Sequence, residues 1–207
     1  MMKRCFCLLA SSVMLLTTGF SAEENLISSG NAVGGEMPFT VGEKSGLRAS
    51  IFQGDPAGGD EKASFEVVLL QEVPPEAPAV NFSFPQIPVD TEQVYRIQFK
   101  AWSSDDVMVL AGGYAFGENR GVPLVQGDTQ KVWQYSVRPE DMGSFKPSDR
   151  GTWMTFETTV GPEGSAASSQ WPADTCFLSF TTWLKGPEGG KVYLNDFRME
   201  PVAAEKK

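Results

Sequence analysis

The sequence predicts an all-β fold, an antiparallel two-sheet β-sandwich of the jelly-roll type. Short apolar or alternating runs recur along the chain, and turn residues separate them, with 21 glycines and 14 prolines in 207 residues. After residue 22 there is no window with the apolar period of an amphipathic helix. This pattern is typical of sandwiches and jelly rolls. The predicted strands are residues 47–52, 63–71, 80–84, 93–102, 107–116, 131–137, 152–160, 175–184 and 190–200.

Alternation inside the predicted strands indicates which side chains form the core. In residues 95–102 (YRIQFKAW) the apolar side chains occupy every second position, and the intervening face carries polar groups and a terminal tryptophan. Because side chains alternate across a strand, the first face is predicted to be buried and the second to face solvent. The same argument in residues 177–184 places Trp183 outside. The predicted core residues are Tyr95, Ile97, Phe99, Phe156, Leu178, Phe180, Val192 and Leu194.

The connections between the strands also have a pattern. The stretch between the second and fourth predicted strands is expected to be extended and irregular, because five prolines interrupt it. Residues 117–150 form a long insertion, which we interpret as a possible extra hairpin, since it contains the aromatic run at 133–135. Residues 201–207 are small and charged, and we expect them to form a flexible tail. The prolines are Pro74, Pro75, Pro78, Pro85 and Pro88.

The first 22 residues have the layout of a secretory signal peptide. Lys3 and Arg4 precede a twelve-residue, mostly apolar run, and small and polar residues follow it. A membrane-spanning helix needs about 20 apolar residues, so the run is too short for an anchor. We therefore expect a secreted or periplasmic protein with no membrane insertion after cleavage, and a single domain over residues 23–200. Cleavage would leave Cys176 as the one cysteine, interpreted as a small buried apolar residue.

Charge and composition exclude several classes of function. The chain carries 17 Lys and Arg against 26 Asp and Glu, a formal net charge of −9. An acidic surface repels phosphates, so nucleic acid is not an expected partner. The chain contains no histidine, which excludes Ser-His-Asp and Cys-His catalysis and imidazole metal sites. The hydrophobic fraction of 41% is sufficient for a packed core.

Two predicted strands end in outward-facing tryptophans among polar groups. Sugar rings present apolar C–H faces that stack on aromatic rings, while their hydroxyls pair with amides, carboxylates and guanidinium groups. Trp102 and Trp183 are therefore candidate stacking platforms. The alternative interpretation is that both rings only cover the ends of their strands beneath a loop.

Four separated segments resemble the CenC-type carbohydrate-binding modules of families 4, 9, 16 and 22. Residues 24–31 (ENLISSGN) resemble the opening motif N-L-x-x-N-G-D-F-E, and residues 95–103 (YRIQFKAWS) resemble the central strand Y-x-x-x-F-x-A-x-S. Residues 153–159 (WMTFETT) and 192–199 (VYLNDFRM) resemble the later motifs W-x-x-x-x-x-F and V-Y-I-D-D-V-S-L. The resemblance spans nearly all of the chain after the signal and implies a galactose-binding-like jelly roll.

The resemblance also implies residue roles. In the family, a concave sheet binds glycans through outward-facing residues, and acidic groups near the opening and last strands often hold a structural calcium. Here Asp196 matches the last-strand acid, and Glu36 is the nearest substitute for the missing opening glutamate, so these two are the expected calcium ligands. The implied sugar-binding residues are Trp102 and Trp183 as platforms and Arg96, Gln98, Lys100 and Glu157 as hydrogen-bonding groups.

The resulting hypothesis is a monomeric, non-catalytic protein that binds a polysaccharide or oligosaccharide, as an accessory to separate glycoside hydrolases. One alternative is a jelly roll of the cell envelope that contacts protein and no longer binds sugar. Another is a glycoside hydrolase or polysaccharide lyase, which needs two carboxylates about 5–10 Å apart across a cleft. We interpret the many acidic side chains instead as a solvated surface.

Overall fold

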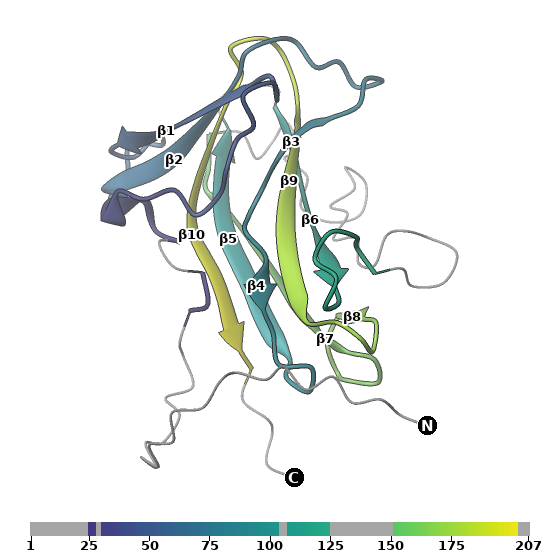
Figure 1. Cartoon of the computed structure of the whole chain (residues 1–207). Helices are drawn as coiled ribbons and strands as arrows, with labels where there is room; N and C mark the ends of the chain where they lie inside the picture. The colour runs from purple at the N-terminus through teal and green to yellow at the C-terminus, as the bar shows by residue number, and fades with distance from the viewer. Residues whose placement is uncertain (1–24, 28–29, 104–106, 125–150, 203–207) are drawn as a thin grey trace, which may run out of the picture.

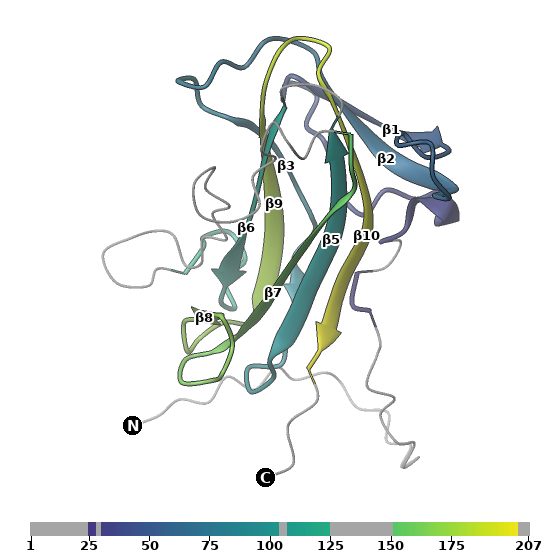
Figure 2. The same ribbon diagram turned by 180° about the vertical axis from the view of Figure 1, so that it is seen from behind.

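The computed structural model describes residues 25–27, 30–103, 107–124 and 151–202. These residues form ten strands, β1 to β10, and one short 3₁₀ helix, η1 (Ala32–Gly34). The strands lie in two sheets that face each other, as Figures 1 and 2 show from opposite sides. The predicted all-β sandwich is therefore confirmed. Among the described residues there is no helix with the length and apolarity needed to span a bilayer.

The larger sheet has six strands in the order β1-β2-β10-β5-β7-β8. Its neighbours are antiparallel except for β7 and β8, which are parallel over three residue pairs. The two central strands, β10 and β5, lie far apart in the sequence, and β10 pairs with β2 on one side and with β5 on the other. The strands are β1 (Leu47–Gln53), β2 (Ala63–Leu69), β10 (Lys191–Pro201), β5 (Tyr95–Ser103), β7 (Met154–Pro162) and β8 (Ser169–Trp171).

The smaller sheet is built around β9. This strand pairs on one side with β3 and then β4, and on the other side with β6 along its whole length. All of these pairings are antiparallel. The strands are β3 (Val80–Ser83), β4 (Ile87–Pro88), β6 (Met108–Phe116) and β9 (Phe177–Lys185).

Eight of the predicted strands agree with the structure to within two residues at either end. The ninth, residues 131–137, lies outside the described residues, as does most of the predicted insertion. Three short elements were not predicted: η1, β4 and β8. Strands of two or three residues contain no measurable alternation, so a periodicity argument cannot find them.

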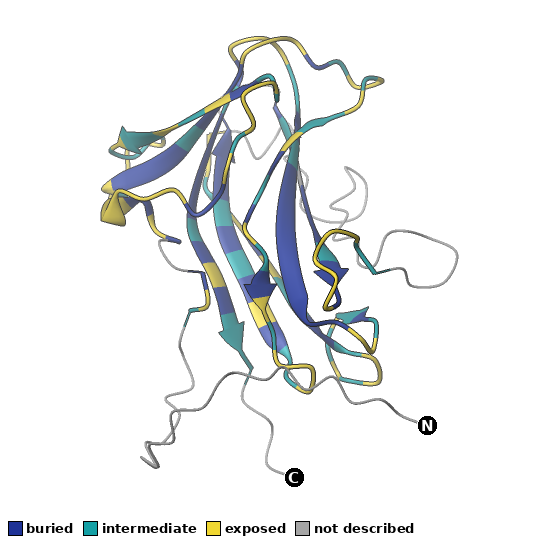
Figure 3. Cartoon of the chain, in the orientation of Figure 1, coloured by how far each residue is buried: buried dark blue, intermediate teal, exposed yellow. Residues whose placement is uncertain are grey.

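The space between the sheets is filled mainly by aromatic and branched aliphatic side chains. All eight predicted core residues are buried, and Figure 3 shows the buried positions along β9 and β5. Phe99 stacks on Phe156, with ring centroids 4.7 Å apart and planes within 9°, and on Phe197 at 5.4 Å. Cys176 is also buried, as predicted, outside this main core.

A β-bulge in β10 adds residues to the core that alternation alone would place outside. The register with β5 shifts between Asn195 and Arg198, and Asp196 takes a left-handed conformation with φ of 56°. One extra residue reverses the faces of the residues that follow. Phe197 and Met199 consequently point inward with Leu194 and are buried.

The N-terminal segment packs against this bulge. The amide N–H of Phe197 donates to the carbonyl of Gly30 at 2.8 Å. A Cβ at Gly30 would lie 2.0 Å from the Phe197 carbonyl oxygen, so only glycine fits there. The side chain of Asn195, which is fully buried, accepts a hydrogen bond from the Ala32 N–H at 3.2 Å and donates to the Ala63 carbonyl at 3.0 Å. Residues 30–32 are thereby fixed to the six-stranded sheet.

Candidate functional site

The outer face of the four-stranded sheet carries a pair of aromatic rings. Trp183 on β9 and Tyr114 on β6 lie with ring centroids 6.2 Å apart in an edge-to-face arrangement. Both are partly buried and neither belongs to the main core, whereas Leu184, the neighbour of Trp183 on the other face of β9, is fully buried. The predicted outward direction of Trp183 is therefore confirmed.

Polar groups surround this aromatic pair. Asn81 on β3 pairs directly with Trp183 in the ladder and is exposed. The Ser83 and Thr181 hydroxyls, on the next outward pair, hydrogen-bond to each other at 3.0 Å. We call the surface formed by Asn81, Ser83, Tyr114, Thr181 and Trp183 the Trp183 face. It combines apolar rings with amide and hydroxyl groups, which is the chemistry that sugar recognition requires.

The other predicted sugar-binding residues lie on the opposite side of the molecule. Arg96, Gln98, Lys100 and Trp102 all project from the outer face of β5 in the six-stranded sheet, and Glu157 pairs with Gln98 from β7. The structure therefore does not bring them together with Trp183. The alternation of side chains predicts which residues share one face of a strand, but it does not show which sheet that strand joins.

The structure does not support the predicted role of Trp102 as a stacking platform. Its side chain projects from the predicted face, but it is only 7% exposed, because Tyr193 on the neighbouring strand packs edge-to-face against it at 5.3 Å. Its indole N–H is buried and has no acceptor among the described residues. A ring covered in this way cannot stack on a sugar, so Trp102 is a structural residue in this conformation.

Three of the remaining predicted polar residues on this face form ion pairs, namely Arg96, Lys100 and Glu157. The guanidinium of Arg96 lies 3.7 Å from the Glu157 carboxylate, with both side chains about half exposed. The Lys100 ammonium lies 3.1 Å from Glu61 and 3.8 Å from Asp196. Exposed pairs such as Arg96 and Glu157 contribute little stability, about 0–1 kcal/mol, so both groups can exchange partners readily.

The geometry does not support the expected calcium ligands. Asp196 accepts a hydrogen bond from Arg198 at 2.7 Å, and Lys100 lies near its second oxygen. Two cations already neutralise this carboxylate, whereas calcium needs six to eight oxygen ligands free to bind it. Glu36 lines a separate hollow beside Met37 and Pro38. Among the described residues there is no group of three or more acidic, cysteine or histidine side chains placed to hold a metal.

A polar hollow on the outer side of the six-stranded sheet was not predicted. It has a volume of about 330 Å³. Lys100 and Thr155, which pair across β5 and β7, line it from the sheet, and Trp153 lies just before β7. The β1–β2 turn supplies three carboxylates. We call this the Trp153 hollow; it is lined by Asp55, Asp60, Glu61, Lys100, Trp153 and Thr155.

Hydrogen bonds fix the indole of this hollow in place. The Trp153 indole N–H donates to Asp55 at 3.0 Å, and the same carboxylate accepts the backbone N–H groups of Ala57 at 2.7 Å and Glu61 at 3.1 Å. Burial opposes ionisation of Asp55, but these hydrogen bonds outweigh it and hold its pKa below the ordinary value. Asp55 is thus an anionic anchor, whereas the general acid of a glycosidase needs a raised pKa.

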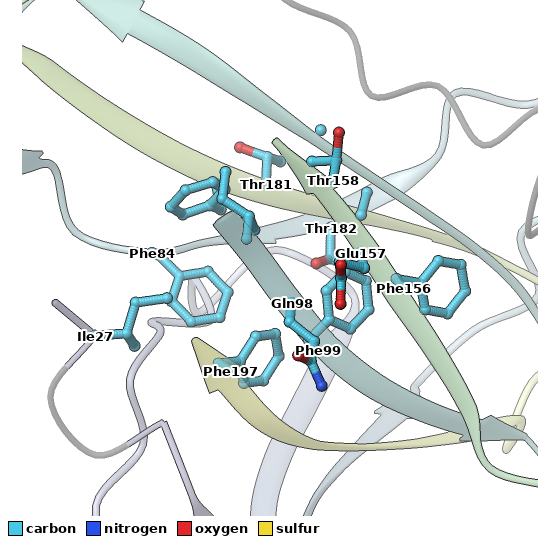
Figure 4. A pocket seen from close by; sticks show the side chains of 14 residues that line it. Ile27, Phe84, Gln98, Phe99, Phe156, Glu157, Thr158, Thr181, Thr182 and Phe197 are labelled. Carbon is cyan, nitrogen blue, oxygen red and sulfur yellow. The ribbon is translucent and has the colours of Figure 1, made fainter. Parts of the chain in front are cut away.

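A second cavity, lined mostly by core residues, lies between the sheets. Figure 4 shows its lining, in which Phe84, Phe99, Phe156 and Phe197 come from both layers of the sandwich. The space within it is about 30 Å³, roughly the volume of one water molecule. It is a packing gap and is too small for a sugar.

Comparisons with known proteins give matches among solved structures only. No family model matches the chain, and no curated protein matches it. A family 61 carbohydrate-binding module solved with β-1,4-galactotriose matches with a TM-score of 0.52 and 15% identity, over 86% of this chain and 99% of that one. A family 16 module matches with a TM-score of 0.50 and 12% identity, over 84% and 99%.

A tailspike enzyme domain of bacteriophage CBA120 also matches, with a TM-score of 0.53 and 12% identity. The alignment covers 86% of this chain but only 21% of the tailspike, so the chain spans about a fifth of that protein. Identities this low establish the architecture and not a shared ligand. The chain therefore has the jelly-roll β-sandwich fold of the carbohydrate-binding modules.

Proposed function

We propose that this protein binds a polysaccharide or oligosaccharide without modifying it, and that the Trp183 face is its binding surface. The observation that carries the proposal is the edge-to-face pair of Trp183 and Tyr114 beside the exposed amide of Asn81. The fold supports it, because the structural neighbours are mostly carbohydrate-binding modules.

The chemistry of the face fits a neutral sugar chain. The rings offer apolar surface to the C–H side of a pyranose, and Asn81 supplies both donors and acceptors to its hydroxyls. Gly112 pairs with Thr181 and adds no side chain to the surface beside the rings. Glycine within a strand often marks a place where a ligand approaches the backbone closely.

Replacing Trp183 by alanine is expected to weaken glycan binding about five- to tenfold while the protein still folds. The estimate takes about 1 kcal/mol or somewhat more for one ring stacked on a sugar, by analogy with aromatic pairs. Isothermal titration with neutral β-linked hexasaccharides of glucose, xylose, mannose and galactose gives the affinity. A melting curve confirms that the variant is folded.

Phe52→Ala is the matched control for this experiment. Phe52 is also partly buried and packs edge-to-face against an aromatic ring, Tyr193, but it lies in the six-stranded sheet. Its loss should leave neutral-glycan binding unchanged. Equal affinities of the parent and Trp183→Ala would place the site elsewhere. A parent that binds none of the four hexasaccharides would favour the protein-contact alternative.

We further propose that residues 1–22 direct export, so that the mature protein acts in the periplasm or outside the cell beside separate glycoside hydrolases. The support for this is the charged start followed by a short apolar run. Residues 1–24 and residues 203–207 of the expected tail lie outside the described residues. Of that tail, Pro201 instead ends β10, and the Val202 N–H donates to the Val94 carbonyl at 2.8 Å.

A further inference from the structure

We propose that the Trp153 hollow is a second carbohydrate-binding site, selective for sugar units that carry no negative charge and strongest for units bearing a free amine. This inference goes beyond the proposed function, because it concerns the opposite sheet and a different class of sugar. Two sites on opposite faces would allow one molecule to hold two glycan chains.

The first argument is that the hollow has the parts of a preorganised sugar site. The indole of Trp153 is partly exposed, and its N–H is bonded to Asp55, so the ring is already oriented when a ligand arrives. Asp55 is in turn fixed by two backbone N–H groups of its own turn. A fixed ring loses little conformational freedom on binding, which favours affinity.

The second argument concerns the groups left available to a ligand. Glu61 is held by Lys100 through one oxygen, at 3.1 Å, and by the Asn195 amide through the other, at 3.0 Å. Asp60, in contrast, is exposed and has no hydrogen-bond or ion-pair partner among the described residues. No described residue occupies the Asp60 carboxylate, so within the described part of the chain it can accept hydrogen bonds from sugar hydroxyls or from an ammonium group.

The third argument is the charge of the hollow. Three carboxylates face a single ammonium, that of Lys100, and the whole chain has a net charge of −9. A uronate brought here would meet like charge, whereas a protonated amine would meet opposite charge. All three sugars offer hydroxyl groups, so the charge of the sugar decides between them. The hollow should bind glucosamine more tightly than N-acetylglucosamine, and galacturonate most weakly.

The test measures binding of three hexasaccharide probes, of glucosamine, N-acetylglucosamine and galacturonate, by isothermal titration at pH 6. The glucosamine hexamer should bind most tightly and the galacturonate hexamer most weakly. Trp153→Ala should weaken glucosamine binding about tenfold, as expected for loss of a stacked ring. Asp60→Asn, an exposed change with no expected cost to folding, should weaken it about three- to fivefold, as expected for one exposed charge pair.

Glu163→Gln is the matched control, because Glu163 is exposed and its substitution changes the net charge by the same amount outside the hollow. It should alter glucosamine binding less than twofold. Equal weakening by Asp60→Asn and Glu163→Gln would show diffuse attraction to an acidic surface and overturn the proposal. Absence of glucosamine binding would also overturn it. Neither result affects the Trp183 experiment, because Trp183→Ala changes the four-stranded sheet and leaves the hollow on the other sheet intact.

Discussion

Replacing Phe99 by alanine is expected to lower the free energy of unfolding by about 3–5 kcal/mol, the usual cost of emptying a buried phenylalanine site. Phe99 is 6% exposed and its ring stacks on both Phe156 and Phe197. Its loss would remove contacts in both directions, and the neighbouring rings, fixed on two strands of the same sheet, cannot collapse fully into the space. Urea denaturation followed by tryptophan fluorescence gives the value.

Leu70→Ala is the control for this prediction. Leu70 is also a large apolar residue, but it lies just after β2 and is 50% exposed. Its truncation should change the free energy of unfolding by less than about 0.5 kcal/mol, as is usual for surface positions. If Phe99→Ala cost no more than Leu70→Ala, the assignment of the inner face of β5 would be wrong.

Asn195→Ala is expected to cost about 2–4 kcal/mol of stability. The side chain is fully buried and bonds to Ala32 in the N-terminal segment and to Glu61 and Ala63 around the start of β2. Alanine would leave a buried backbone N–H and a buried carbonyl without this partner, and each unsatisfied group costs about 1–3 kcal/mol. Thermal unfolding should show the loss, and amide exchange at residue 32 should accelerate.

Asn81→Ala is the control, because it removes an asparagine side chain that lies outside the buried hydrogen-bond network of Asn195. Asn81 is exposed on β3 and makes no comparable set of buried bonds. Its substitution should leave the melting temperature nearly unchanged. If the two variants melted alike, the Asn195 side chain would not be the link between the N-terminal segment and the bulge.

The strands and the core were predictable because the physical signal is local. A period of two over seven to nine residues identifies a strand and its buried face, and this was correct for Phe99 and Phe180. It failed at Phe197, because a bulge reverses the alternation and leaves no mark in the hydrophobic pattern. Asp196 with its positive φ marks the bulge, but aspartate occurs in many other settings.

The candidate sites depended on information that is not local. Trp102 and Trp183 both point outward from their strands, yet these strands belong to different sheets, so the rings lie on opposite faces. Trp102 is covered by Tyr193, more than ninety residues away in the chain. Trp153 was missed as a candidate binding residue because its partner Asp55 is also distant. The acidic turn at residues 55–61 was a weak signal for that site.

The most direct test of carbohydrate binding on the Trp183 face is a nuclear magnetic resonance titration that follows the indole N–H signals. The chain has five tryptophans, so each signal can be assigned by substitution. Adding the tightest-binding neutral hexasaccharide should shift the Trp183 signal and leave Trp102 and Trp171, which are buried, unchanged. Shifts confined to Trp102 or Trp171, or no shift at saturating sugar, would contradict the account.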